Sequence, residues 1–327
     1  APPSVVYLPG GSQRSTLFPI ARQMERFNQP NHIDQATAAC GIGIYRDVLL
    51  GEEFLGDSFT CEPAHSLVTR VELSPQGFTF SGSRAPHDRD SEFLASTSTW
   101  FTPVQSRPGP DGALWVVDLA RPVIEHPRWI PPERLARLNV RAGDDLGRIF
   151  RVSRKGAPLR PIRDLTRLGL EDLVAALETP NGVARDLVHL ELLFRDARAA
   201  VPLLDRLFRA SQLPPVRVQV LALIEAFGGN SAERLQSALR DSHPGVRRFA
   251  IALSERFLRA PSPLDESMAS LVDDSDLGVR TQLAFSLGEW HDAANGARLL
   301  GTLAGRDLDN TWLRAAVASS ATKDPVG

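Results

Sequence analysis

Residues 246–257 read VRRFAIALSERF and residues 279–290 read VRTQLAFSLGEW, two runs whose apolar residues have helical spacing. An arginine holds the second position of each run, and the same place recurs along the C-terminal half of the chain. These arginines are Arg185, Arg217, Arg247, Arg280 and Arg314, at steps of 32, 30, 33 and 34 residues. Because one step accommodates two helices and two turns, it predicts a stack of paired helices from about Leu165 onward.

Aspartate precedes two of these arginines by six residues, Asp241 before Arg247 and Asp274 before Arg280. A cation at a helix N-terminus is disfavoured by the helix macrodipole, so its recurrence predicts a compensating partner. We expect Arg247 and Arg280 to point along the stack toward carboxylates of adjoining repeats. Asp241 and Asp274 are the first candidates. A generic helical bundle would not explain the near-constant step.

The N-terminal half has a different pattern, in which short β-rich runs alternate with turn signals. Strands are expected at 40–46, 57–62, 67–73 and 78–83, with a tight turn at 74–77, and a second group at 100–105, 113–119 and 147–152. The repetition of strand, loop and strand favours propeller blades over a sandwich. We therefore expect a mixed, two-domain fold. Residues 1–155 would form the closing blades of a partial β-propeller, and residues 156–327 a HEAT-type α-α solenoid.

Composition excludes some classes of function. The 327 residues carry a net charge of -2, so no global basic field attracts nucleic acid. No run of 18 apolar residues exists, so no membrane span is expected. Residues 1–3 lack the features of a signal peptide, and residues 4–8 (SVVYL) already look like a strand. We expect the chain to begin within a longer protein.

Long stretches of both halves resemble the PVC-type membrane-bound dehydrogenases. The stretches are TAACGIGIYRD (37–47), DSFTCEPAHSLVTR (57–70), SEFLASTSTWFTPV (91–104), GPDGALWVVDLARPVIEHPRWIP (109–131), GDDLGRIFRV (143–152), TPNGVARD (179–186), DSHPGVRRFAIALSE (241–255), VRTQLAFSLGEW (279–290) and WLRAAVASS (312–320). The resemblance implies a quinoprotein sugar-dehydrogenase-like propeller, then HEAT-like repeats, then a cytochrome c domain. The chain departs from the family pattern at Thr102, Ala120, Ser66 and Val183-Ala184.

The resemblance implies a piece of an exported sugar or alcohol dehydrogenase, periplasmic or at the cell surface, that passes electrons to a c-type haem domain. Pyrroloquinoline quinone with calcium, and haem c, would belong to the full-length parent. No cofactor is identifiable in this chain, which contains no C-x-x-C-H motif for haem attachment. The alternative is a non-catalytic scaffold that binds a saccharide on the propeller or a protein partner on the solenoid. No nucleic-acid partner is expected.

The two cysteines, Cys40 and Cys61, each lie in a strand-like segment. From the residues alone, a disulfide between neighbouring antiparallel strands and two buried free thiols fit equally well. The resemblance places them in paired ACG and CEP motifs. It therefore implies a disulfide and an oxidising compartment.

The first candidate site is catalytic and consists of Asp118, Arg121, Glu125 and His126, just after a core strand. Residues at strand ends can line the central funnel of a propeller. His126 would take a proton from an alcohol while Glu125 or Asp118 orients it. In the alternative, Asp118 and Arg121 form a structural ion pair and His126 only begins a loop.

The second candidate site is for substrate or cofactor binding and consists of Glu62, His65 and Trp100. Glu62 and His65 follow another strand, so the same funnel geometry applies, and the alternative is a turn held by hydrogen bonds. No metal site is expected. Calcium requires six to eight oxygen ligands, so we expect a β-turn at 109–112 rather than a calcium loop. The remaining histidines lack metal-ligand spacing.

Overall fold

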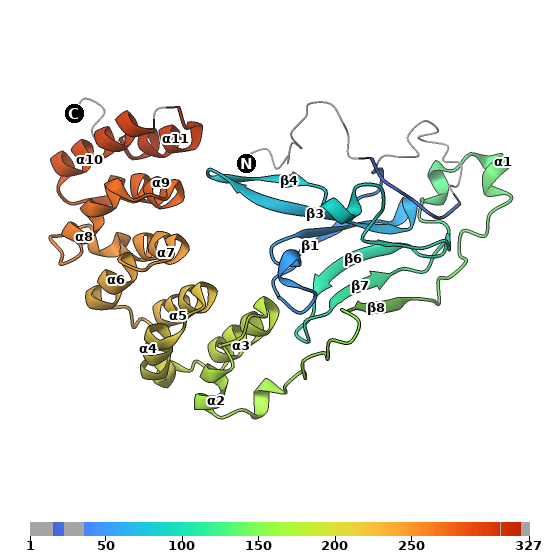
Figure 1. Ribbon diagram of the computed structural model, residues 1–327, viewed down its shortest axis with the longest axis horizontal. Coiled ribbons are helices and arrows are strands. Elements are labelled where there is room, and N and C mark those ends of the chain that lie inside the picture. Colours follow the sequence, from blue (N-terminus) through green and yellow to red (C-terminus); the bar gives the residue numbers. More distant parts are fainter. Residues whose placement is uncertain (1–15, 23–35, 308, 322–327) are drawn as a thin grey trace. The chain divides into compact units, whose positions relative to one another are not determined.

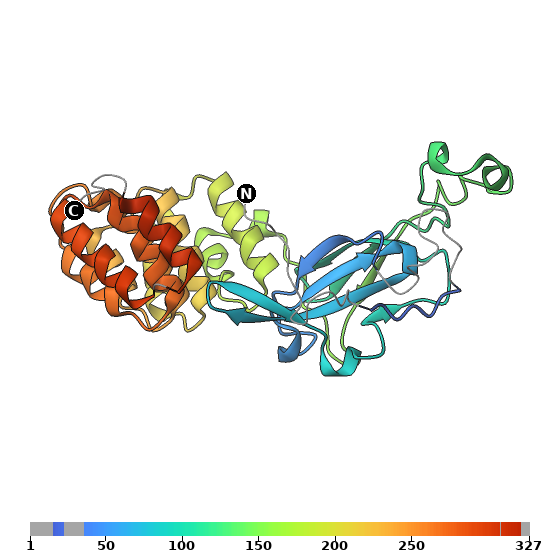
Figure 2. The same ribbon diagram turned by 90° about the horizontal axis from the view of Figure 1, so that it is seen from above.

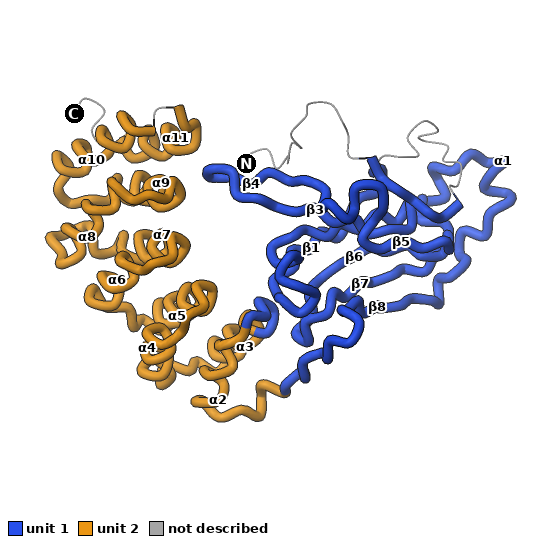
Figure 3. The backbone as a smooth tube through the Cα atoms, in the orientation of Figure 1, with its two compact units in different colours: residues 1–163, 180–184 blue, residues 164–179, 185–327 orange. Residues whose placement is uncertain are grey.

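The computed structural model describes residues 16–22, 36–307 and 309–321. The strand-like run at 4–8 lies outside these residues. The chain forms two compact units, shown in different colours in Figure 3. The sheet unit comprises residues 1–163 and 180–184, and the helical unit comprises 164–179 and 185–327. The domain boundary was expected between residues 155 and 156. In the structure the last strand ends at Val152, and the first α-helix of the helical unit begins at Leu170.

The sheet unit contains two antiparallel sheets (Figure 1). The first sheet has the order β1-β2-β3-β4 with β5 paired to β3, and the second has the order β6-β7-β8. The strands are β1 Cys40–Ile44, β2 Ser58–Glu62, β3 Leu67–Gln76, β4 Thr79–Ser83, β5 Leu94–Ala95, β6 Pro103–Pro108, β7 Leu114–Asp118 and β8 Arg148–Val152, and a one-turn helix α1 spans Pro132–Leu135. The described residues form no closed barrel, so the propeller stays a prediction.

The reversal between β3 and β4 differs from the expected turn at 74–77. Strand β3 continues to Gln76, and Pro75 pairs with Phe80 in the ladder. The chain turns instead at Gly77 and Phe78, where Gly77 has a φ of 60°. A glycine adopts this left-handed conformation without a steric penalty. Proline is tolerated in a strand where its missing N–H does not belong to the ladder, which explains why Pro75 does not end β3.

The two sheets enclose one apolar core and approach each other most closely at β1 and β6. A Cβ atom on Gly41 would collide with the carbonyl oxygen of Val104, so only glycine permits this approach. The Ser106 hydroxyl lies 3.0 Å from the Gly41 carbonyl oxygen and 2.9 Å from that of Phe59, and so links both sheets. The core residues are Tyr45, Leu50, Phe59, Cys61, Val68, Phe101, Leu114 and Val116.

Tyr45 crosses this core, and its hydroxyl donates to the Gly112 carbonyl at 2.6 Å and accepts from the Leu50 N–H at 3.1 Å. Burial raises the pKa of Tyr45 to about 12. A raised folded-state pKa means that stability is lost as the pH rises from the ordinary tyrosine value of about 10 toward 12. We expect an alkaline absorbance titration to show a late phenolate step that Tyr45→Phe removes. An unchanged titration curve in the variant would contradict this burial.

The helical unit consists of antiparallel helix pairs stacked side by side (Figures 1 and 2). Helix α5 packs on α7, α7 on α9 and α9 on α11, and one continuous apolar core runs through the stack. The helices are α2 Leu170–Ala175, α3 Gly182–Phe194, α4 Val201–Ala210, α5 Pro214–Ala226, α6 Ala232–Leu239, α7 Pro244–Ser254, α8 Asp265–Ser270, α9 Leu277–Ser286, α10 Ala293–Arg306 and α11 Thr311–Ser320. No helix in the described ranges combines the length and apolar character that a membrane span requires.

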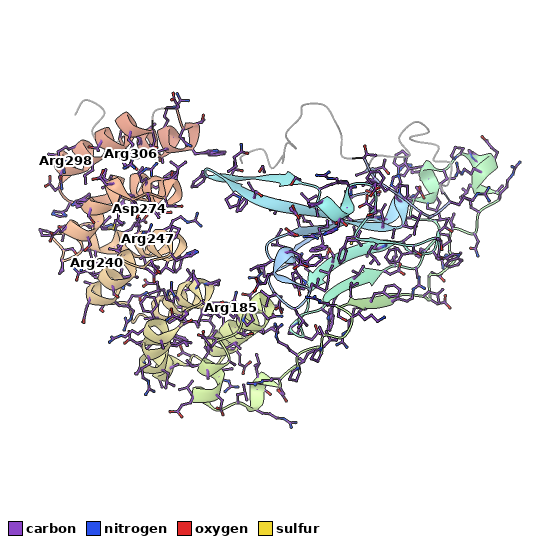
Figure 4. All side chains as sticks on the ribbon, viewed as in Figure 1. Arg185, Arg240, Arg247, Asp274, Arg298 and Arg306 are labelled. Atoms are coloured by element: carbon purple, nitrogen blue, oxygen red, sulfur yellow. The ribbon has the colours of Figure 1, made fainter. Side chains whose placement is uncertain are left out.

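Three of the recurring arginines bind carboxylates of adjoining repeats, among them Arg247 and Arg280, as expected. Arg217 pairs with Asp241 at 2.8 Å, Arg247 with Asp274 at 2.7 Å and Arg280 with Asp307 at 2.7 Å. We call these three pairs the arginine ladder. Figure 4 labels Arg247 and Asp274 in neighbouring layers of the stack.

The expected partners of the ladder need one correction. For Arg247 and Arg280, the aspartate six residues earlier in the chain is not the ion-pair partner. It contributes its main-chain carbonyl oxygen instead, at 2.9 Å for Asp241 and Arg247 and at 2.7 Å for Asp274 and Arg280. The carboxylate comes from the following repeat, 27 residues further along for Arg247 and Arg280. Asp241 and Asp274 therefore each have two partners. The carboxylate forms an ion pair with the preceding arginine of the ladder, and the main-chain carbonyl accepts a hydrogen bond from the next one.

Candidate functional site

Glu62 and His65 form a buried pair where β2 turns into β3. Glu62 is the last residue of β2, and the 3₁₀ turn Pro63–His65 brings the His65 Nδ1 to 3.2 Å from the Glu62 Oε1. The two residues are only 1% and 2% exposed. Ser66 follows with a left-handed φ of 57°, which lets the chain reverse into β3.

The carboxylate of Glu62 is also held from its other side. The Ala38 N–H lies 3.0 Å from Oε1 and 3.1 Å from Oε2. A carboxylate held in this way fixes the imidazole tautomer with the proton on Nδ1, so that Nε2 can accept a proton. No residue in the described ranges hydrogen-bonds to the Nε2 of His65. The pair is thus arranged as an oriented proton acceptor.

The two cysteines lie directly beside this pair. Cys40 and Cys61 are register partners on β1 and β2, which confirms that they are opposite on neighbouring strands. Burial raises the pKa of Cys40, and the negative charge of Glu62 adds to this. Burial raises the pKa of Cys61 to about 12, partly opposed by a hydrogen bond with Ser106.

The implied disulfide is not formed in the structure, where both cysteines are free thiols. The raised pKa values have a consequence for its formation, because thiolate is the species that attacks in thiol–disulfide exchange. The raised pKa values of Cys40 and Cys61 disfavour the thiolate in the folded protein. The disulfide stays a prediction.

Asp118 ends β7 and is saturated by structural hydrogen bonds. It accepts from the N–H groups of Thr102 at 2.8 Å and Ala120 at 2.9 Å. It also accepts from Arg148 on the neighbouring strand, at 2.6 Å. The alternative ion pair with Arg121 is therefore replaced by one with Arg148. Arg121 donates instead to the carbonyl of Val140 at 2.8 Å.

The remaining catalytic candidates lie in the loop after β7. His126 is exposed, and its Nδ1 accepts from the Arg128 N–H at 3.1 Å, which caps the 3₁₀ turn Pro127–Trp129. Glu125 is half-buried, and its Oε2 accepts from the N–H of Ile124 at 3.3 Å. In the described part of the chain, no hydrogen bond or ion pair joins His126 to Asp118. His126 caps a turn in the loop, and Asp118 holds the end of β7 to its neighbours.

Trp100, the third member of the second candidate set, precedes β6 and is 40% exposed. Its ring lies beside Gly143, where an added Cβ would be 3.2 Å from the Trp100 ring. No hydrogen bond joins Trp100 to Glu62 or His65 among the described residues. The structure therefore brings Glu62 and His65 together and leaves Trp100 as a separate exposed aromatic.

Residues 2–156 match a known family. It is described as a domain of unknown function (DUF7133). The match to DUF7133 covers the eight strands of the sheet unit, including the Glu62–His65 pair, and stops before the helical unit begins. No curated protein matches the chain. The similarity to DUF7133 therefore assigns no activity, and the chemistry must be argued from the side chains.

A buried cluster around Asp47 escaped the sequence analysis. Asp47 is fully buried and accepts hydrogen bonds from Arg160 and Asn181. Asn181 also donates to the Gly109 carbonyl at 2.8 Å, which holds the residues before α3 on the sheet unit. The partners are 113 and 134 residues from Asp47. No local pattern signals such a contact, and its saturation indicates a structural role.

Proposed function

We propose that this chain is part of an exported quinoprotein-type dehydrogenase that oxidises a sugar or alcohol, with the Glu62–His65 pair as proton acceptor. The buried hydrogen bond between His65 Nδ1 and Glu62 Oε1 carries this proposal. The two antiparallel sheets act as closing propeller blades, and the helix pairs as HEAT-type repeats. The resemblance of both halves to the PVC-type dehydrogenases supports the same assignment.

Oxidation of an alcohol requires a base for the hydroxyl proton, and His65 is suited to this step. Its Nε2 would take the proton while Glu62 stabilises the imidazolium that forms. The described residues contain no group of three or more His, Cys, Asp and Glu side chains able to hold a metal ion. They therefore do not fit the calcium that accompanies pyrroloquinoline quinone. The role of this chain's residues is confined to accepting the proton.

His65→Gln tests this proposal in the intact protein, with sugars and simple alcohols as substrates and an artificial dye as electron acceptor. Loss of a general base is expected to lower kcat by about 10²–10⁴-fold. KM should change little, because the base acts in the transition state. Glu62→Gln should show a smaller loss of the same kind, since it orients the imidazole without receiving the proton.

The matched control is His126→Gln, which changes a histidine that is exposed on a loop. It should leave kcat and KM at wild-type values. Added imidazole should restore part of the activity to His65→Ala, a result that a purely structural role would not produce. A folded His65→Gln protein with wild-type kcat would refute the proposal.

A scaffold is the second candidate function, and one surface favours it. On α3, Leu187, Leu190 and Phe194 are 42%, 47% and 82% exposed and follow one helical face. An apolar stripe of this kind is typical of a surface that docks a protein. Absence of turnover by the wild-type intact protein with every sugar and alcohol, together with partner binding that Phe194→Ser abolishes, would favour the scaffold.

A further inference from the structure

We propose that the free edge of β8 binds an extended acidic peptide strand of a partner protein. Strand β8 pairs with β7 along one side (Figure 1). No described residue pairs with its other side, so the main-chain N–H and C=O groups there have no strand partner within the described ranges. An exposed edge of this kind is a template for the addition of another strand.

The side chains of β8 are unusually apolar for an exposed edge. Ile149 is 63% exposed and Phe150 is 38% exposed, and successive residues of a strand point to opposite faces. Ile149 is also the register partner of Val117, which is 38% exposed. An added strand could therefore bury apolar surface on both faces. Charged side chains are one of the features that protect an edge strand from association. On β8 the charged side chains lie among exposed apolar ones, so the edge is only partly protected.

The charge around β8 specifies the chemistry of the partner. Residues 146–163 contain six basic residues and no acidic residue, in a chain of net charge -2. Arg148, Arg151 and Arg160 pair with the buried carboxylates of Asp118, Asp111 and Asp47.

Arg154 and Lys155 lie two and three residues after the end of β8, are exposed, and have no acidic partner among the described residues. Arg148 and Arg151 remain 49% and 48% exposed despite their ion pairs. The positive charge without an acidic partner therefore lies just past the C-terminal end of β8, at Arg154 and Lys155, and charge complementarity there selects an acidic occupant.

Two other occupants are disfavoured by the same charge. A second copy of the chain would bring an identical basic edge against this one, and like charges would repel. The residues outside the described ranges carry three acidic residues, Glu25, Asp34 and Asp324, balanced by Arg14, Arg26 and Lys323. No run of acidic residues occurs in the sequence of these segments. We therefore take the occupant to be an acidic segment of a partner protein.

The experiment uses a labelled seven-residue peptide of alternating glutamate and valine, with binding to the whole chain followed by fluorescence anisotropy. Saturable binding is expected. The double variant Arg154→Gln/Lys155→Gln should weaken binding at least about tenfold, as expected for two lost charge contacts, and Ile149→Thr should weaken it several-fold. Arg298→Gln is the matched control, because Arg298 is exposed on α10 of the helical unit, and it should bind as wild type (Figure 4).

A fully N-methylated peptide of the same sequence separates strand addition from simple charge attraction. It keeps every carboxylate but has no main-chain N–H to donate, so its binding should be at least about tenfold weaker. Equal binding of both peptides would overturn strand addition and leave a general polyanion surface, as would equal binding of a single-stranded oligonucleotide. Absence of any binding by the unmodified peptide would overturn the proposal altogether.

Discussion

Replacing Arg247 with alanine is expected to lower the free energy of unfolding of the helical unit by about 3–5 kcal/mol, the usual cost of removing one partner of a buried ion pair. Arg247 donates to both carboxylate oxygens of Asp274, at 2.7 Å each. The two side chains are 13% and 6% exposed. The variant would leave Asp274 buried without its counter-ion and the Asp241 carbonyl without its donor. Urea unfolding followed by helical circular dichroism measures the loss.

Two further variants make this result specific to the ladder. Arg247→Lys keeps the charge but cannot form the two-pronged contact, so an intermediate loss is expected. Arg248→Ala removes the adjacent, exposed arginine and should unfold like wild type. If Arg247→Ala also unfolds like wild type, the ladder contributes nothing to stability and this account of it is wrong.

The ladder also predicts how the effect depends on pH. Burial would raise the pKa of Asp274, but hydrogen bonds from Arg247 and the Asp276 N–H, together with the charge of Arg247, hold that pKa below its ordinary value. A lowered pKa contributes stability above the unfolded value of about 4, and this stability is lost as the pH falls through the folded value. The difference between wild type and Arg247→Ala should therefore shrink in acid.

Asp118→Ala is expected to destabilise the second sheet by roughly 3 kcal/mol, because the buried N–H groups of Thr102 and Ala120 would lose an acceptor worth about 1–3 kcal/mol each. Arg148 adds less, since its side chain is 49% exposed and can be hydrated. Hydrogen exchange of β6, β7 and β8 should localise the loss. Any fall in activity should follow the unfolded fraction.

His126→Gln serves as the control for this prediction too, because His126 lies in the loop after the same strand. It should change neither stability nor exchange. If Asp118→Ala folds with wild-type stability but loses turnover, Asp118 is a catalytic group and its assignment as a strand anchor is wrong. Asp118→Asn keeps an acceptor for the N–H groups and should fall between alanine and wild type.

The candidate site was predictable in part. Glu62 and His65 are three residues apart on either side of a proline, so the sequence placed them at one strand end. Their hydrogen bond depends on the 3₁₀ turn and on the left-handed Ser66, which no apolar pattern encodes. The alternative ion pair between Asp118 and Arg121 was wrong, because a neighbouring strand supplies Arg148 as the partner instead.

The sequence by itself determined the local elements. Apolar periods of two and of 3.6 residues specify strands and helices through neighbouring residues, so seven of the strands and the stacked helix pairs were expected. The step of 30–34 residues between arginines likewise reflects packing of each repeat on the next. Only the tertiary structure decided the polar partners of the buried carboxylates. Asp274 binds Arg247, Asp118 binds Arg148, and Asp47 binds Arg160 and Asn181. The physical reason is that a buried carboxylate takes whichever donor the fold brings within about 3 Å, and separation along the chain does not determine that distance.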